Sequence, residues 1–316
     1  MSDAKLESHR LKNWLHSAVL ILAMGAILAL VGWFLAGMSG LLVAAGFGLL
    51  SALVSPRMSP KLMLRLYRAR PVSRREAPGL YAMVRRLADR ADLEHAPELF
   101  MIPSSMLNAM TVGRPRDAVI GVTDGLLRNM DREETRAILA HEIAHLASGD
   151  TRVMAIADAI AQLTNTMSTV GKLLLFINLP LILVGAVTVP WTVVAVLILA
   201  PVASGLLQLA LSRTREFDAD ANAVRLTGDP EALVRGLKKL ETYNESMMKH
   251  LLAPGYGRPE PSLLRTHPHT ERRIERLRQL DTDAMEPPEG TEDVEVHRGV
   301  ERVDRGPRWH ARGLWF

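Results

Sequence analysis

The chain lacks cysteine altogether, which excludes a disulfide framework and fits a reducing compartment. A second absence is more informative. Residues 13–56 and residues 173–212 contain no Asp, Glu, Lys or Arg, although charged residues make up 23% of the chain. Charge-free stretches of this length are not expected in an ordinary soluble domain, so they point to a membrane protein.

Each charge-free stretch is about twice the roughly 20 residues that an α-helix needs to cross the hydrocarbon core. Each therefore predicts a helical hairpin, and the chain is expected to have four transmembrane helices. The first stretch divides at residues 37–40, and the second divides near Pro190 and Trp191, which suit a turn at the membrane surface. A cleaved signal peptide is the alternative for the first span, but a second apolar run follows it directly.

The basic residues predict the orientation. No acidic residue lies between the first hairpin and Glu76, whereas basic residues are frequent there and at the N-terminus, and others bracket the second hairpin. Because positive charge resists translocation, both termini and everything except the hairpin tips are expected on the cytoplasmic side of a bacterial-type inner membrane. The basic residues are Lys5, Arg10, Lys12, Arg57, Lys61, Arg65, Arg68, Arg70, Arg74, Arg75, Lys172, Arg213 and Arg215.

The same basic segment and a pI near 9.6 also raise the alternative of nucleic-acid binding. Its position beside a membrane span favours anionic lipid as its partner, and the two apolar stretches argue against a soluble DNA- or RNA-binding protein. We therefore expect the lipid bilayer, and no nucleic acid, among the partners.

Short periodic segments outside the charge-free stretches predict a mixed α+β domain. Asp131 and Glu134 have the spacing of a capping box that starts a helix, which should run to Ser148 and stop at Gly149. The other predicted elements are an amphipathic helix over 78–93, a strand over 98–102, a β-hairpin of 109–112 with 118–122, a helix that starts at Asp229-Pro230, a helix over 271–280 and a mobile charged tail over 281–316.

The motif that carries chemistry is His141-Glu142-Ile143-Ala144-His145, which lies inside the capped helix. Histidines at i and i+4 present their nitrogens to one side of a helix and can bind a single zinc ion. The carboxylate of Glu142 can then act as general base on a water that zinc activates for attack on a peptide carbonyl. The alternative is a structural helix with two polar surface histidines.

A third ligand is available in the segment from Arg213 to Asp220. Glu216 and Asp218 are both suitable by chemistry, and the residues alone leave the choice open. Asp220 lies four residues after Glu216 on the same helix face, where it can accept a hydrogen bond from a ligand histidine. Two histidines and one carboxylate leave a fourth position open for water. Another divalent ion such as cobalt could occupy the same ligands.

Residues 108–277 resemble the HtpX-type heat-shock membrane proteases, a gluzincin group related to the CAAX prenyl proteases and the mitochondrial Oma-type protease. The family also has two N-terminal spans and two more between the metal-binding helix and the glutamate ligand. The stretches that carry the resemblance are Asn108–Gly113 with Val122–Leu127, Ala140–His145 with Gly149–Asp150, Ser212–Asp220, and Thr266–Pro268 with Arg273–Ile274.

The resemblance implies a role for several further residues. It selects Glu216 as the third ligand and places His267 and Arg273 near the site, where His267 would stabilise the oxyanion and Arg273 would order Asp220 or the glutamate. Asp150 is expected either to support the metal site or to cap a helix end. The strand over Asn108, Ala109, Met110 and Thr111 resembles the edge on which such proteases pair an extended substrate.

These observations predict a mainly α integral membrane protein with four transmembrane helices and a cytoplasmic zincin-like α+β domain with a small sheet. The expected order is an N-terminal hairpin over 1–56, the first part of the protease domain over 57–172, a second hairpin over 173–212, the second part over 213–280, and the tail over 281–316.

The expected activity is that of a zinc endopeptidase with one zinc per subunit. It would cut membrane proteins in cytoplasmic or juxtamembrane segments, with a role in quality control under stress that rests on the resemblance. A CAAX-type processing protease is the alternative among enzymes, and a non-catalytic membrane scaffold of the same fold is the alternative among non-enzymes. The presence of His141, Glu142, His145 and Glu216 argues against the scaffold.

Overall fold

The computed structural model describes residues 3–54, 64, 67–251 and 270–279. The expectations for His267 and for the tail therefore concern residues outside this part of the chain. The chain divides into two compact units, each made of two separate segments. The apolar unit comprises residues 1–57 and 152–214, and the mixed unit comprises residues 58–151 and 215–316.

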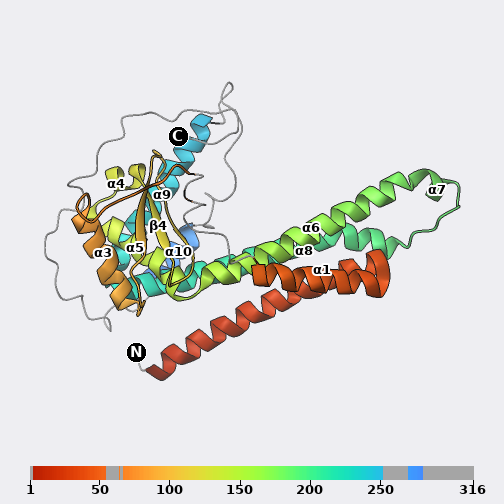
Figure 1. Ribbon diagram of the computed structural model, residues 1–316, viewed down its shortest axis with the longest axis horizontal. Helices are drawn as coiled ribbons and strands as arrows, with labels where there is room; N and C mark the ends of the chain where they lie inside the picture. The colour runs from red at the N-terminus through yellow and green to blue at the C-terminus, as the bar shows by residue number, and fades with distance from the viewer. Residues whose placement is uncertain (1–2, 55–63, 65–66, 252–269, 280–316) are drawn as a thin grey trace. The chain divides into compact units, whose positions relative to one another are not determined.

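The mixed unit contains a four-stranded sheet in the order β1-β2-β4-β3 (Figure 1). Strand β2 pairs with β1 in antiparallel and with β4 in parallel orientation, and β3 pairs with β4 in antiparallel orientation. Within the described sheet, β3 therefore has a strand on one side only. The strands are β1 (Arg70–Pro71), β2 (Glu98–Ile102), β3 (Ala109–Val112) and β4 (Val119–Thr123).

The predicted strands agree closely with the observed ones. Strand β2 has the predicted bounds, and β3 and β4 form the predicted hairpin, with Ala109 opposite Val122. The parallel pairing of β2 with β4 and the two-residue strand β1 were not predicted. Both depend on contacts between distant segments, which local hydrophobic patterns do not specify.

Helix α5 (Arg132–Ala147) is the central helix of the mixed unit. Its capping box forms as predicted: Asp131 accepts a hydrogen bond from the backbone of Glu134, and the Glu134 carboxylate accepts one from the backbone of Asp131. The side chains of Leu139 and Ile143 are fully buried, and burial of each stabilises the fold by about 1.5–3 kcal/mol. Strand β3 contacts α5 along this helix.

The other helices of the mixed unit pack around the same core. The buried residues of α3 are those of the predicted apolar face, Leu80, Met83, Val84 and Leu87. Helix α4 was not predicted; Thr123 caps it by accepting a hydrogen bond from Leu126. The helices are α3 (Pro78–Arg90), α4 (Asp124–Asn129), α9 (Pro230–Leu251), α10 (Thr270–Arg278) and the end of α8 (Trp191–Thr227).

The apolar unit begins with α1 (Asp3–Val54), which is two helical arms joined at a break. Ala36 and Gly37 leave the helical region of φ and ψ, and Gly37 has a φ of +57°. A Cβ atom on Gly32 would lie 2.5 Å from the carbonyl oxygen of Gly40. Only glycine permits so close an approach of the two arms. The break lies at the predicted division of the first charge-free stretch.

The second part of the apolar unit consists of α6 (Asp150–Ile177), the short α7 (Leu179–Leu183) and most of α8. Helix α6 packs against α8: a Cβ atom on Gly171 would lie 2.7 Å from the Leu197 side chain. The Asp158 carboxylate accepts a hydrogen bond from the Gln208 amide between the same two helices.

Large apolar side chains cover much of the outer surface of this unit, as expected for contact with lipid. Within the described residues, two helices are long and apolar enough to cross a membrane, over Asn13–Leu50 and Trp191–Thr227. Four such spans are therefore not found. The apolar stretch over Asn13–Leu50 covers both arms of α1. Helix α6 begins well before the second charge-free stretch and contains Asp158 and Lys172.

Candidate metal centre

Helix α5 carries both histidines of the motif on one buried face. His141 and Glu142 are 2% and 6% exposed. The imidazole rings of His141 and His145 meet edge to face with centroids 4.6 Å apart, and their Nε2 atoms are 3.1 Å apart. The spacing of four residues thus brings two potential donor nitrogens to one point, because side chains at i and i+4 lie on the same side of a helix.

Glu216, on α8, completes a group of three donors at this point. Its Oε2 atom is 3.4 Å from Nε2 of His141, and its Oε1 atom is 3.5 Å from Nε2 of His145. One donor atom from each of the three residues lies within 4.8 Å of the others. Asp218 does not belong to this group, because a residue two positions on points to the opposite side of a helix.

The chemistry of this donor set fits a metal ion. Two imidazoles and one carboxylate are a combination that binds zinc in catalytic sites. In the metal-free protein, burial opposes a charge on His145, but hydrogen bonds and charges from Asp150 and Glu216 outweigh it and raise its pKa to about 10. The pKa of His141 is also raised, because Asp220 and Glu216 outweigh its burial. The surrounding carboxylates thus favour positive charge at the two histidines.

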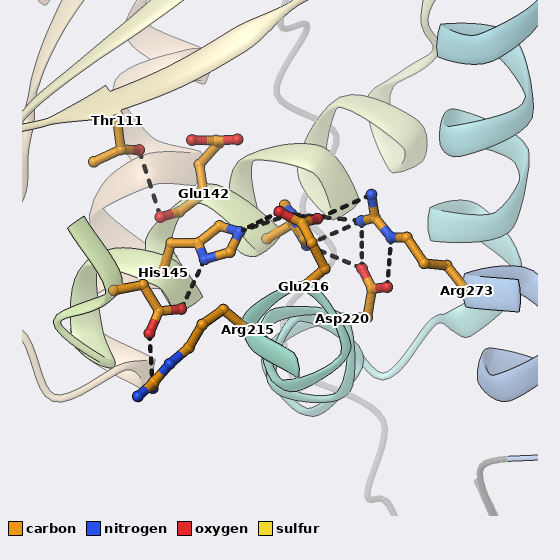
Figure 2. A network of polar contacts seen from close by, with 9 residues as sticks. Thr111, Glu142, His145, Arg215, Glu216, Asp220 and Arg273 are labelled. Carbon is orange, nitrogen blue, oxygen red and sulfur yellow. Dashed lines mark hydrogen bonds and ion pairs between the residues drawn. The ribbon is translucent and has the colours of Figure 1, made fainter. Parts of the chain in front are cut away.

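Asp220 and Arg273 support His141 and Glu216 from one side of the site (Figure 2). The Oδ1 atom of Asp220 is 3.0 Å from Nδ1 of His141. Arg273, on α10, donates to both oxygens of Asp220 at 2.7 and 2.6 Å, and its Nη1 atom is 3.0 Å from Oε2 of Glu216. Burial would raise the pKa of Asp220, but Arg273 and His141 lower it to about 2.

Asp150 supports His145 in the same manner. It is the first residue of α6, and its Oδ2 atom lies 2.8 Å from Nδ1 of His145. This contact is compatible with the first of the two roles expected for Asp150, support of the metal site, which stays a prediction. Its Oδ1 atom accepts a hydrogen bond from Nη1 of Arg215 at 3.0 Å. The sequence analysis gave Arg215 no role at the site. The feature that could have indicated one is its position directly before Glu216.

The segment predicted to bind substrate lies beside the motif. Thr111, on β3, donates a hydrogen bond at 3.4 Å to the backbone oxygen of Glu142 (Figure 2). The backbone of Asn108 is fixed by Thr123, whose hydroxyl accepts from its N–H at 2.9 Å and donates to its carbonyl at 2.8 Å. Ala109 and Met110 continue this strand next to α5. His267 lies outside the described residues.

Comparison with known proteins identifies the family. Residues 74–281 match peptidase family M48. This chain belongs to peptidase family M48. Among curated proteins it is similar to the protease HtpX homolog of Nostoc punctiforme, with 35% identity over 280 residues that cover 85% of this chain and 96% of the relative. It is also similar to the protease HtpX homolog of Burkholderia multivorans, with 33% identity over 286 residues that cover 85% and 97%.

Among solved structures, the crystal structure of Ste24p from S. mikatae is similar, with 21% identity, a TM-score of 0.43 and coverage of 84% of this chain and 66% of that chain. Membership of family M48 identifies the chain as a metalloprotease that acts on protein substrates and uses a metal cofactor. The group of His141, His145 and Glu216 is the site in the described residues that could hold that metal. The two long apolar helices fit association with a membrane.

Proposed function

We propose that this M48 protease is a zinc endopeptidase anchored in the bilayer, which cuts membrane proteins on the cytoplasmic side in protein quality control. One observation carries the assignment of the site. The donor atoms of His141, His145 and Glu216 converge. The Nδ1 atom of each histidine, which points away from this group, faces a buried carboxylate. A scaffold that had lost activity would not need this complete arrangement.

The carboxylates of Asp220 and Asp150 set the tautomer of the two histidines. Each accepts the N–H of an Nδ1 atom, so that each Nε2 atom keeps a lone pair directed at the metal position. His141, His145 and Glu216 would therefore hold the zinc. When bound, zinc supplies Lewis acidity, which favours attack by water on a peptide carbonyl and stabilises the developing charge.

Glu142 is the proposed general base. It lies one residue after His141 on α5 and is 6% exposed, and it does not belong to the group of three donors. Its carboxylate takes the proton of the attacking water and then delivers it to the leaving amine. General acid–base catalysis of this kind contributes about 10²–10⁴-fold to the rate.

Strand β3 is the proposed binding site for substrate. Within the described sheet it pairs with β4 on one side only, and Thr111 links it to the backbone of Glu142. An extended peptide that adds to its other side as a further strand would run past the catalytic carboxylate. Main-chain hydrogen bonds would supply affinity with little sequence preference, as a quality-control protease requires.

The cytoplasmic placement rests on charge and on the four-span layout. Arg68, Arg70, Arg74 and Arg75 follow the first apolar stretch, and Lys172 and Arg213 flank the second. Under the positive-inside rule these residues stay in the cytoplasm. If each arm of α1 crosses the membrane, and if α6 and α8 do so as well, the mixed unit lies entirely on that side.

The test of the activity compares wild-type protein with Glu142→Gln, both purified in detergent, on casein and on a model membrane protein, with metal content measured on both. We expect the variant to retain its metal and to lose cleavage by about 10²–10⁴-fold, because only the proton acceptor is removed. Stoichiometric zinc without cleavage by the wild type would favour the scaffold instead.

A further inference from the structure

Arg215 has a buried guanidinium that the proposed chemistry does not use. The residue is 7% exposed, and its partner Asp150 is 2% exposed. Arg215 Nη1 donates to one oxygen of Asp150 at 3.0 Å, and the other oxygen of Asp150 lies 2.8 Å from Nδ1 of His145. Asp150 thus links Arg215 to His145, a proposed metal ligand; Figure 2 labels Arg215 and His145.

We propose that Arg215 is a positioning residue for the metal site, which fixes the Asp150 carboxylate and through it the ring and tautomer of His145. The inference rests on the proposed function, since it takes His145 as a metal ligand. With one oxygen held by the guanidinium, the carboxylate presents its second oxygen to the histidine in one orientation. A buried carboxylate without this cation would be costly and would turn toward water.

The other ligand histidine has a matching arrangement. Arg273 holds Asp220, and Asp220 faces Nδ1 of His141. Each histidine thus faces a carboxylate that an arginine holds, and in the view of Figure 2 Arg215 and Arg273 lie on either side of Glu216. This correspondence supports a role for Arg215 in the metal site.

The position of the ion pair in the chain gives it a second consequence. The first segment of the mixed unit ends at Thr151, directly after Asp150, and its second segment begins at Arg215. Asp150 therefore lies where the chain enters the apolar unit, and Arg215 lies where it returns to the mixed unit. The ion pair joins these two points, although the residues are 65 positions apart. A displacement of the start of α6 relative to α8 would act directly on His145.

The first experiment measures the rate at which zinc passes from the full-length, zinc-loaded protein in detergent to a chromogenic chelator. Loss of such a supporting contact typically weakens metal binding by about 10–100-fold, so we expect Arg215→Gln to release zinc at least about tenfold faster than wild type. Arg215→Lys keeps the charge and should fall between the two. The matched control is Lys239→Gln, which removes a 2.6 Å ion pair to buried Glu134 on α5 and should release zinc at the wild-type rate.

A double-variant cycle with Asp150→Asn tests whether Arg215 acts through the Asp150 carboxylate. If it does, Arg215→Gln adds little to the rate of zinc release once Asp150 is replaced. An effect of Arg215 that is independent of Asp150 predicts that the effects of the two substitutions multiply in the double variant. Thermal unfolding of the metal-free proteins reports whether each variant folds.

If the double variant does not fold, the absorption bands of bound cobalt in the single variant test the inference. They should change in Arg215→Gln and stay as in wild type in Lys239→Gln. The inference is overturned if Arg215→Gln keeps the wild-type release rate or the wild-type cobalt bands, or if the effects of Arg215→Gln and Asp150→Asn multiply in the double variant. A wild-type protein that binds no zinc would instead overturn the proposed function, which separates the two failures.

Discussion

The two proposed ligand histidines show how single residues determine the properties of the site. The carboxylates of Asp220 and Asp150 lie within hydrogen-bond distance of the Nδ1 atoms of His141 and His145. The Nε2 atoms of the two histidines then converge beside Glu216. The spacing of the motif predicts that the two histidines share a helix face, and the spacing within α8 predicts that Asp220 can reach one of them.

Arg215 could not be assigned in the same way. Its partner Asp150 lies 65 positions earlier in the chain. The two residues meet because the chain leaves the mixed unit directly after Asp150 and Thr151 and returns to it at Arg215. Sequence spacing predicts contacts within one helix, but it does not predict contacts between residues that are far apart in the chain. The choice of Glu216 over Asp218 likewise needed the resemblance to a family, because both carboxylates are suitable by chemistry alone.

Zinc binding should weaken as the pH falls. The pKa of metal-free His145 is raised to about 10 by Asp150 and Glu216 acting against burial, so at neutral pH the ring holds a proton that zinc must displace. The apparent affinity should therefore drop about tenfold per pH unit for each proton displaced. Titration calorimetry between pH 6 and 8, in buffers with different ionisation enthalpies, measures this release; an affinity independent of pH would contradict it.

At the scale of elements, α5 is the part of the fold that the sequence specifies best. Asp131 and Glu134 define its start, and Gly149, with a φ of +69°, follows its end. The hairpin of β3 and β4 is equally local, since its strands flank a turn-rich segment. The parallel pairing of β2 with β4 was missed, because it depends on packing between segments that are distant in sequence.

The start of α5 should contribute measurably to stability. Asp131→Ala removes the acceptor for the backbone N–H of Glu134, and loss of such a cap costs about 1 kcal/mol. We expect a lower midpoint of thermal unfolding than in wild type. Glu133→Ala, an exposed change in the same turn of α5, is the matched control and should have a smaller effect; equal shifts in both variants would indicate that the capping box contributes nothing.

At the scale of the whole molecule, the apolar unit is an excursion inside the proposed protease domain. The chain leaves the mixed unit after Thr151 and re-enters it at Arg215, next to the proposed ligand Glu216. The sequence predicts this layout, because the charge-free stretch separates the motif from the glutamate. It does not predict where α6 begins, since Asp158 and Lys172 interrupt the apolar pattern of that helix.

The absence of cysteine allows a direct test of the membrane topology. A single cysteine introduced in place of Arg75 should react with a membrane-impermeant maleimide only when the cytoplasmic side is accessible. A cysteine in place of Ala186, between α7 and α8, should react from the opposite side if the chain crosses four times. Labelling of both positions from the same side would contradict the four-span layout.

The most direct test of the proposed zinc protease is to restore activity to metal-stripped protein with known amounts of zinc. We predict that cleavage of casein rises linearly and reaches a plateau at one zinc per chain. Glu216→Ala should not regain activity under the same conditions, whereas the matched control Asp218→Ala should regain it. Full activity in the metal-stripped wild type, or recovery in Glu216→Ala but not in Asp218→Ala, would contradict the proposed site.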